Sequence, residues 1–283
     1  MLGHAMFRVL AADRNLDVYG TTRATATAGF NRPSLAGRLL TGVDVSNPDA
    51  LTRVFGDLRP VVVINCIGLV KQAAGSDDPL LAVPLNTLLP HRLAALCRVS
   101  DARLIHISTD CVFSGKKGSY AETDAPDATD VYGLSKLLGE SHHSSVVTLR
   151  TSMIGHELAN RRGLVDWFLA QKGPVKGFSR AIFSGVPTDE LAAIVRDKVL
   201  GNPTLRGLYH VAATPISKYE LLLLLAQEYG RQNDILPRDT PVIDRSLDGE
   251  RFRLATGYVA APWPELIRRM RDFAASAAAP EEA

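Results

Sequence analysis

Cysteine is scarce in this sequence, and neither sign of charge is in excess. The 283 residues include only three cysteines, at positions 66, 97 and 111, which excludes a disulfide framework and indicates reduced thiols. Lysine and arginine together number 32 and aspartate and glutamate 30, so the formal net charge is only +2. A charge this close to balance gives no electrostatic reason to expect a nucleic-acid partner.

Long apolar runs and targeting segments are also lacking. The longest candidates, residues 61–64 and 221–226, fall short of the roughly 18–20 residues that a membrane helix needs. The first residues do not show the basic flank, apolar stretch and cleavage site of a signal peptide. We therefore expect a cytoplasmic protein without a membrane partner. The 46% of hydrophobic residues suffices for a large buried core and excludes intrinsic disorder.

Strand-like and helix-like apolar periods alternate through the first half of the chain. Amphipathic helices are predicted over residues 2–13, 48–58, 86–99 and 131–141. Strands are predicted over 17–22, 61–65, 103–108 and 146–150, and a short one ends at 44–46. This alternation predicts an α/β fold, a doubly wound, Rossmann-type parallel sheet with helices on both faces. Ligands of such sheets bind beyond the carboxyl ends of the strands.

Glycine and proline interrupt this pattern from residue 153 onward. We predict a Rossmann-type domain over 1–152, a smaller C-terminal substrate lobe over 153–273 with segments returning to the first domain, and a disordered tail over 274–283. No metal site is expected. The adjacent His142 and His143 would point in different directions from a helix.

Tyr132 and Lys136 carry the sharpest chemical signal. Their spacing of four places both side chains on one helix face. A phenol has a pKa of about 10, and we expect the Lys136 ammonium to lower it. Tyr132 could then protonate a carbonyl oxygen as hydride arrives at its carbon, and Thr109, at the end of the preceding strand, could hydrogen-bond the same oxygen. The spacing alone is common, and an ordinary surface pair would show it too.

Longer motifs surround this pair. Residues 108–115 read Ser-Thr-Asp-Cys-Val-Phe-Ser-Gly, 131–140 read Val-Tyr-Gly-Leu-Ser-Lys-Leu-Leu-Gly-Glu, and 150–152 read Arg-Thr-Ser. Phe-Ser-Gly-Val-Pro-Thr follows at 183–188 and Gly-Leu-Tyr-His-Val at 207–211. In these motifs and in Glu122, the chain resembles the extended short-chain dehydrogenase/reductases. Within them it is similar to the dTDP-4-dehydrorhamnose reductase branch, which reduces a 4-keto group on a nucleotide-linked deoxysugar.

The resemblance implies a role for each matching residue. Tyr132 would be the proton donor, Lys136 would hold the nicotinamide ribose, and Thr109 would be the third catalytic hydroxyl. Asn86 matches a family asparagine behind the site, and Met153 stands where the family has tryptophan near the sugar. The implied NAD(P)-binding set is Gly3, Arg23, Asp44, Val45, Cys66, Ile67, Gly68, Tyr132 and Lys136. The implied substrate-binding set is Ser108, Thr109, Asp110, Met153 and Arg180.

Two arginines enter these sets by their chemistry. Arg23 follows the second predicted strand, where an acidic residue would bind a ribose 2′-hydroxyl and an arginine accommodates a 2′-phosphate. We therefore expect NADP(H) to be favoured over NAD(H), although a solvated arginine at a loop start explains the position nearly as well. Arg180 is one of several basic residues of the smaller lobe that could bind a substrate diphosphate, because arginine matches phosphate in a bidentate way.

The glycine turn of a dinucleotide fold is nearly absent. A first strand should lead into Gly-x-x-Gly-x-x-Gly, whose backbone N–H groups receive the cofactor pyrophosphate. Only Gly3 matches, as the last of these glycines. Either the given start is too late, or this is a truncated form that binds cofactor poorly. We favour the first, in which the coding sequence extends upstream by roughly eight to ten residues, the length of a short strand plus the turn.

Three other functions compete with simple reduction. A sugar-nucleotide 4,6-dehydratase would carry an Asp-Glu pair where this chain has Asp110-Cys111, which argues against it. A nucleotide-sugar 4-epimerase needs no added acid and stays open. A relative of this branch is a regulatory subunit of methionine adenosyltransferase, and the intact Thr109, Tyr132 and Lys136 speak against that non-catalytic role. The expected partners are the nucleotide-sugar substrate and a second copy of the chain in a homodimer.

Overall fold

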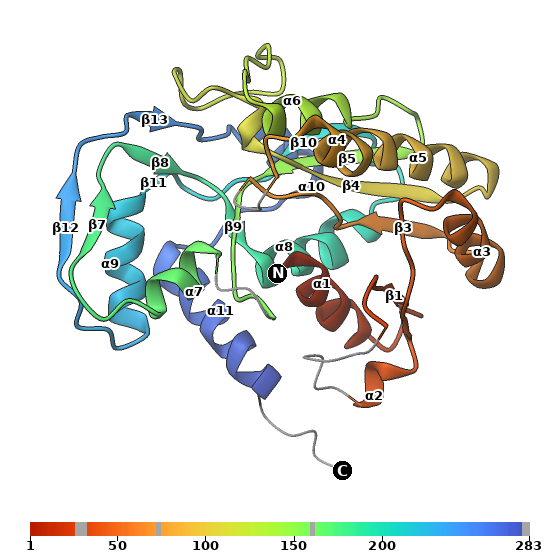
Figure 1. Cartoon of the computed structure of the whole chain (residues 1–283), viewed down its shortest axis with the longest axis horizontal. Coiled ribbons are helices and arrows are strands. Elements are labelled where there is room, and N and C mark those ends of the chain that lie inside the picture. The colour runs from red at the N-terminus through yellow and green to blue at the C-terminus, as the bar shows by residue number, and fades with distance from the viewer. Residues whose placement is uncertain (26–32, 72–74, 159–161, 279–283) are drawn as a thin grey trace.

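A parallel sheet of four strands forms the centre of the molecule, and the computed structural model describes residues 1–25, 33–71, 75–158 and 162–278. Helices α4, α5 and α6 lie on one face of this sheet, and α1 and α8 lie on the other (Figure 1). The strand order is β10-β5-β4-β3, with every pair parallel. The α/β Rossmann-type architecture predicted from the sequence is confirmed.

The helices are α1 (Leu2–Ala11), α2 (Pro33–Ala36), α3 (Pro48–Leu58), α4 (Pro79–Ala82), α5 (Leu89–Val99), α6 (Val131–Leu138), α7 (Leu164–Leu169), α8 (Thr188–Ile194), α9 (Lys218–Glu228), α10 (Glu250–Thr256) and α11 (Trp263–Ala278). Two π-helical turns are η1 (Val83–Leu88) and η3 (Val195–Leu200), and one 3₁₀ turn is η2 (Asp110–Val112). The strands are β1 (Gly20–Thr21), β2 (Leu39–Leu40), β3 (Val62–Asn65), β4 (Arg103–Thr109), β5 (Val146–Thr151), β6 (Met153–Ile154), β7 (Val175–Phe178), β8 (Ala181–Phe183), β9 (Val186–Pro187), β10 (Gly207–His210), β11 (Ile216–Ser217), β12 (Ile235–Arg238) and β13 (Ile243–Asp244).

Strands β4 and β5 hold the core together. Every residue of both strands is buried, as the apolar runs in the sequence require for a sheet covered on both faces. Their register places Leu104 beside Val146 and Ile107 beside Leu149. Because both strands run parallel, their carboxyl ends meet at one edge, where Thr109 lies beside Thr151.

Strand β3 pairs with β4 alone among the described residues, while β1 and β2 form a separate parallel pair. The strand predicted to end at 44–46 is misplaced. The residues that pair with β1 are instead Leu39 and Leu40, which form β2. Residues 44–46 form a turn instead. The Asp44 carboxylate accepts hydrogen bonds from the Ser46 amide at 2.9 Å and hydroxyl at 2.7 Å. Such a side-chain bond to nearby backbone competes with strand pairing.

One continuous helical stretch begins seven residues earlier than the predicted start at 86. It runs from Pro79 to Val99, and the Asp78 carboxylate caps it by accepting from the Leu80 amide at 2.8 Å. By length and composition alone this 21-residue stretch could cross a membrane, a property that core helices share. Here Leu89 and Cys97 are buried in a core cluster against the sheet.

The second half of the chain builds a smaller lobe and also returns to the sheet. The lobe contains the three-stranded sheet β11-β8-β13 and the pair β12-β7, which lie beside α9 in Figure 1. Strand β10 pairs with β5 in the main sheet, and α8 packs against α1. This arrangement places the junction between the two parts near the carboxyl ends of β4 and β5.

Helix α11 extends into the segment that was predicted to be a disordered tail. Disorder was expected from residue 274, but the helix continues through Ala278, and residues 279–283 lie outside the described part of the chain. The cause is Arg8 on α1, whose guanidinium donates to the Phe273 carbonyl at 2.9 Å and to the Ser276 hydroxyl at 3.0 Å. The same guanidinium stacks 3.8 Å from the Phe273 ring centre.

Two glycines of the smaller lobe provide a matched test of this packing. A Cβ on Gly185 would collide with the backbone carbonyl of Ser152 and lie 2.7 Å from the Phe183 ring, whereas a Cβ on Gly173 would meet nothing within 4 Å. We expect Gly185→Ala to destabilise the protein by about 1–3 kcal/mol, because the backbone must move to relieve the overlap. Gly173→Ala should stay within about 0.5 kcal/mol of the parent. Urea denaturation of both variants measures this, and equal stabilities would contradict the packing described.

Candidate active site

Helix α6 begins beside the end of β4, and its cap explains its position. The Asp130 carboxylate accepts from the Gly133 amide at 2.9 Å and pairs with the Lys71 ammonium at 2.9 Å. Gly133 allows the helix to lie against η2, since a Cβ there would collide with the carbonyl oxygen of Cys111. This close packing brings Tyr132 to the end of β4.

Tyr132 is half-buried, and burial raises the pKa of its phenol above the usual value of about 10. The nearby Cys111 thiol adds to the rise, and the nearby Thr109 hydroxyl opposes it. The expectation that Lys136 lowers this pKa is wrong, because its ammonium instead donates to the Ile107 carbonyl at 2.7 Å. The phenol therefore keeps its proton at neutral pH and is able to donate it.

Lys136 lies at the bottom of the site, with 5% of its surface exposed. Burial lowers the pKa of its ammonium to about 8, and the negative charge of Glu140 partly opposes this. Gly68, in the turn after β3, faces it: a Cβ on Gly68 would lie 3.9 Å from Lys136 Nζ and 3.1 Å from Asn86 Oδ1. The absent side chain therefore leaves an approach between the end of β3 and the ammonium.

Asn86 joins the turn after β3 to helix α6. Its amide oxygen accepts from the Leu69 backbone N–H at 2.8 Å. Its amide nitrogen donates to the Leu69 carbonyl at 3.2 Å and to the Ser135 hydroxyl at 3.1 Å. The residue is fully buried in the π-helical turn η1, a distortion often found at functional sites. Asn86 thus fixes the position of Ser135, and of the adjacent Lys136, relative to the turn after β3.

Thr109 and Asp110 end β4 with their side chains linked. The Thr109 hydroxyl donates to the Asp110 carboxylate at 3.2 Å and accepts from the Cys111 amide at 3.1 Å. Burial raises the pKa of the Asp110 carboxyl, and the positive charges of Arg245 and Lys218 oppose the rise. The carboxyl is therefore buried, within electrostatic reach of two cations.

Ser108, predicted to bind substrate, is placed elsewhere. It is 2% exposed, and its hydroxyl donates to the Glu140 carboxylate at 2.6 Å. Arg150 forms a bidentate pair with the same carboxylate, through Nε at 2.8 Å and Nη2 at 2.7 Å. Arg150 Nη1 lies 3.4 Å from His210, and burial lowers the pKa of that imidazole to about 4, which keeps it neutral. Ser108 thus belongs to a buried polar network behind the site.

The residues predicted to hold the cofactor fall into two places. At the first, Gly3 in the first turn of α1 meets Cys66 at the end of β3, since a Cβ on Gly3 would lie 3.8 Å from the Cys66 Cβ. Burial raises the pKa of the Cys66 thiol to about 12, so it acts as a small packing group. Val45 and Ile67 are half-buried against a core cluster of α3, α5 and the sheet.

At the second place, Arg23 after β1 and Asp44 after β2 lie near one another. The Ser46 hydroxyl lowers the pKa of the exposed Asp44 carboxyl most, and the charge of Arg23 adds to this. The Arg23 side chain is exposed and forms no ion pair with the described residues. It is therefore open to an anionic ligand.

Met153 and Arg180 receive different positions. Met153 lies in β6 and is half-buried against the main core. Only Ser152 separates it from the end of β5 at Thr151. Arg180 is exposed, and only its backbone carbonyl is engaged, accepting from the Ile243 amide at 3.0 Å. Sequence reasoning assigned no role to Glu140 and Arg150, although both stand in the motifs quoted above. Arg245 and Lys218 stand in no motif at all.

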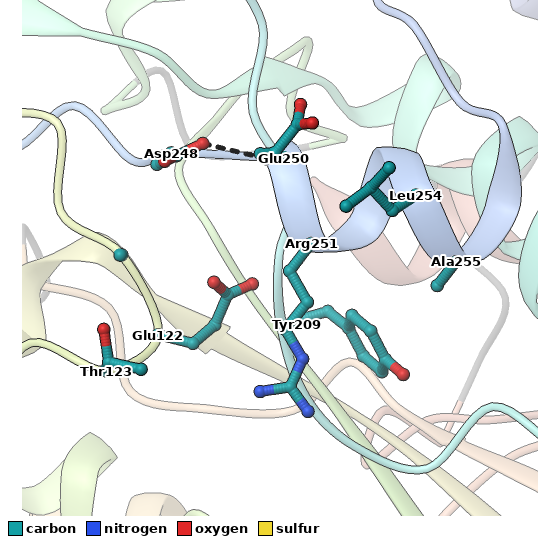
Figure 2. A pocket seen from close by; sticks show the side chains of 9 residues that line it. Glu122, Thr123, Tyr209, Asp248, Glu250, Arg251, Leu254 and Ala255 are labelled. Carbon is teal, nitrogen blue, oxygen red and sulfur yellow. Dashed lines mark hydrogen bonds between the residues drawn. The ribbon is translucent and has the colours of Figure 1, made fainter.

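A cavity of about 570 Å³ lies away from this site, between β10 and α10. Figure 2 shows Glu122 and Arg251 pointing toward its centre, with Tyr209 beside them. The Arg251 guanidinium lies 5.0 Å from the Tyr209 ring centre. Glu122 also accepts from the His210 amide at 2.7 Å, so it supports β10 as well as lining the cavity. None of the three predicted catalytic residues lines it.

Comparison with known proteins gives consistent matches. A family model described as the RmlD substrate binding domain matches residues 1–248. The dTDP-4-dehydrorhamnose reductase of Aggregatibacter actinomycetemcomitans is 25% identical over 257 residues, 82% of this chain and 87% of the relative. Methionine adenosyltransferase 2 subunit beta of Mus musculus is 25% identical over 263 residues, 80% and 76% of the two chains. A solved dTDP-4-dehydrorhamnose reductase from Bacillus anthracis str. Ames, in complex with NADP, shares the fold with a TM-score of 0.74 at 22% identity, over 83% and 90% of the two chains.

The buried ion pair between Glu140 and Arg150 leads to a prediction about stability. Glu140→Gln leaves the Arg150 guanidinium buried without a counter-charge, so we expect a loss of about 3–5 kcal/mol in the free energy of unfolding. The matched control is Glu250→Gln, which breaks a solvent-exposed pair with Arg253 and should change stability little. Chemical denaturation of both variants measures the difference. Similar stabilities for the two would show that the buried pair contributes no more than the exposed one.

Proposed function

The chain belongs to the RmlD substrate binding domain family, and from this premise we propose that it is an NADP(H)-dependent reductase of a nucleotide-linked 4-keto-deoxysugar. The observation that carries the proposal is the half-buried phenol of Tyr132, which lies beside Thr109 at the end of β4 and one helix turn from the buried Lys136. A site that protonates a developing alkoxide needs a neutral acid of this kind.

Each residue then has one task. Tyr132 gives its proton to the keto oxygen, and Thr109 donates a hydrogen bond to the same oxygen as negative charge develops there. The Lys136 ammonium, with its pKa near 8, is charged at neutral pH and would hold the nicotinamide ribose. A bound nicotinamide cofactor supplies the hydride. Gly68 presents bare backbone where a Cβ would lie 3.1 Å from Asn86 Oδ1, which fits the close approach of such a group, and Lys136, Gly3 and the turn after β3 would hold it.

NADP(H) is the cofactor we propose. Arg23 has no carboxylate bonded to it among the described residues, and its guanidinium suits a ribose 2′-phosphate. Ser46 engages one oxygen, Oδ1, of the exposed Asp44 carboxylate nearby, so the preference for NADP(H) rests on Arg23. Cys66, Cys97 and Cys111 remain as free thiols, in line with the cytoplasmic location expected from the sequence.

The second candidate is a non-catalytic subunit. It is favoured by the similarity to methionine adenosyltransferase 2 subunit beta, which covers 80% of this chain. A chain with that role has no need for a neutral acid beside a buried lysine, so the site favours the reductase. A 4-epimerase would use the same residues. Release of oxidised cofactor in each turnover separates reduction from epimerisation, and capture of a partner subunit separates both from the regulatory role.

Removal of the phenol tests the proton donor. Tyr132→Phe keeps the ring and deletes the hydroxyl, so we expect the rate of NADPH consumption with a 4-keto sugar nucleotide to fall about 10²–10⁴-fold. Binding of NADPH, followed by fluorescence, should stay nearly unchanged. Tyr229→Phe, which deletes another half-buried phenol far along the chain, is the control. Near-parental turnover by Tyr132→Phe would refute the assignment.

A charge change at Arg23 tests the cofactor. Arg23→Asp places a carboxylate where we expect the 2′-phosphate, so the ratio of NADPH to NADH efficiency should fall by about tenfold or more. Arg14→Asp makes the same charge change at another exposed arginine and should leave the ratio unaltered. Steady-state kinetics with both cofactors measures it. A constant ratio in the Arg23 variant would make this arginine an ordinary surface residue.

A further inference from the structure

A row of buried polar side chains crosses the middle of the main sheet. The strand register places Asn65 of β3 beside His106 of β4, and His106 beside Thr148 of β5. Each of the three is 3% exposed or less. Two residues earlier on each strand, the same face is apolar and packs in a core cluster, through Val63, Leu104 and Val146. Burying a polar side chain costs free energy unless it forms hydrogen bonds, so the partners of this row decide what it does.

Asn65 uses both ends of its side-chain amide. Its Oδ1 accepts from the Ile67 backbone N–H at 3.1 Å, and its Nδ2 lies 3.2 Å from His106 Nδ1. Because a backbone N–H can only donate, the first bond fixes which end of the amide faces His106. The amide nitrogen can only donate as well, so His106 Nδ1 is the acceptor. The imidazole is therefore the tautomer that carries its proton on Nε2.

The surroundings of His106 keep this imidazole neutral. Burial lowers its pKa well below the usual value of 6.5, and the nearby Lys136 and His91 lower it further. A protonated imidazole would carry a hydrogen on Nδ1 and could not accept from Asn65. The bond between the two side chains therefore persists at neutral pH. By contrast, the Thr148 hydroxyl forms no hydrogen bond within the described part of the chain.

The two bonds of Asn65 end in the turn after β3, at the proposed cofactor site. Ile67, which Asn65 holds, directly precedes Gly68, the residue whose bare backbone fits the close approach of a nicotinamide cofactor. On the other side of Gly68, the Leu69 N–H donates to Asn86 Oδ1 at 2.8 Å. The turn is therefore fastened on both sides of Gly68, by Asn65 before it and by Asn86 after it.

We propose that His106 is a positioning residue for the nicotinamide cofactor: it holds the Asn65 amide in the orientation that fixes the turn at Ile67 and Gly68. The inference rests on the proposed function, because it takes this turn as part of the cofactor site. His106 is 1% exposed and acts through Asn65. Without an acceptor at Nδ1, the buried Asn65 amide loses a partner and can rotate away from Ile67. The backbone at Gly68 is then no longer held in one position for the cofactor.

Two amide substitutions separate the two nitrogens of the ring. The amide oxygen of asparagine can take the place of Nδ1, whereas glutamine places its amide near Nε2 and leaves Nδ1 without a replacement. We expect His106→Gln and His106→Leu to weaken NADPH binding about three- to tenfold in fluorescence titrations, and His106→Asn to restore most of it. The KM for NADPH should rise by the same factor while kcat falls less, because other contacts hold Tyr132.

Thr148→Val is the matched control. It removes a hydroxyl that is as deeply buried, lies beside His106 in the register and has no bonded partner among the described residues. This variant should bind NADPH like the parent, because neither Asn65 nor the turn depends on that hydroxyl.

Hydrogen exchange of the cofactor-free protein, followed by mass spectrometry, tests the turn without any ligand. The amides of residues 65–69 should exchange about three- to tenfold faster in His106→Leu and His106→Gln than in the parent. His106→Asn and Thr148→Val should exchange at nearly the parental rate. Residues 146–151 of β5 serve as the reference segment, which the loss of a single anchor of the turn should leave unchanged.

Parental exchange of residues 65–69 in the leucine and glutamine variants overturns the inference. Equal acceleration in residues 146–151 also overturns it, since His106 would then only stabilise the sheet. If glutamine restored both readouts as well as asparagine does, the acceptor at Nδ1 would not matter. Should His106→Leu fail to fold, His106→Gln, which stays polar, carries the same test. A parent that shows the expected exchange but binds no nicotinamide cofactor would contradict the proposed function and leave the anchoring of the turn by His106 standing.

Discussion

The bidentate pair between Glu140 and Arg150 fixes the geometry on which the site depends. Glu140 follows the end of α6, Arg150 lies in β5, and Ser108 of β4 donates to the same carboxylate. One carboxylate therefore sets the distance from the end of α6 to two neighbouring strand ends. A buried ion pair adds little to stability compared with apolar packing, but its geometry is narrow. That narrow geometry suits a site in which Tyr132 and Lys136 come from α6 and the Thr109 hydroxyl comes from β4.

Much of the fold could be predicted from the sequence because it rests on local patterns. The apolar runs of β3, β4 and β5 and the capped start of α3 are visible without any structure. The strand at 39–40 was missed because a two-residue strand has no periodicity to detect. The helical end of α11 was missed because Arg8, 265 residues away, holds it through the Phe273 carbonyl. Contacts between distant segments leave no signal in a local pattern.

In the candidate site, too, features within one element could be predicted from the sequence, whereas contacts between elements could not. Tyr132 and Lys136 share a helix, so their spacing predicted their common face. The direction of the Lys136 ammonium depends on the Ile107 carbonyl in a neighbouring strand, and the sequence-based pKa argument failed for that reason. Single-residue chemistry suggested basic residues of the smaller lobe as phosphate ligands, but the positions of these side chains depend on strand pairing that a local pattern does not show.

Strand β3 has a consequence for handling the protein. Its segment, residues 61–65, is almost wholly β-branched and carries no charge, and among the described residues it pairs on one side only. Val61 at its start is 79% exposed. An uncharged, β-branched edge with unpaired backbone groups is a template for strands of other chains. Concentrated solutions of this chain are therefore prone to edge-to-edge association, and a lysine introduced at Val61 would discourage aggregation without entering the core.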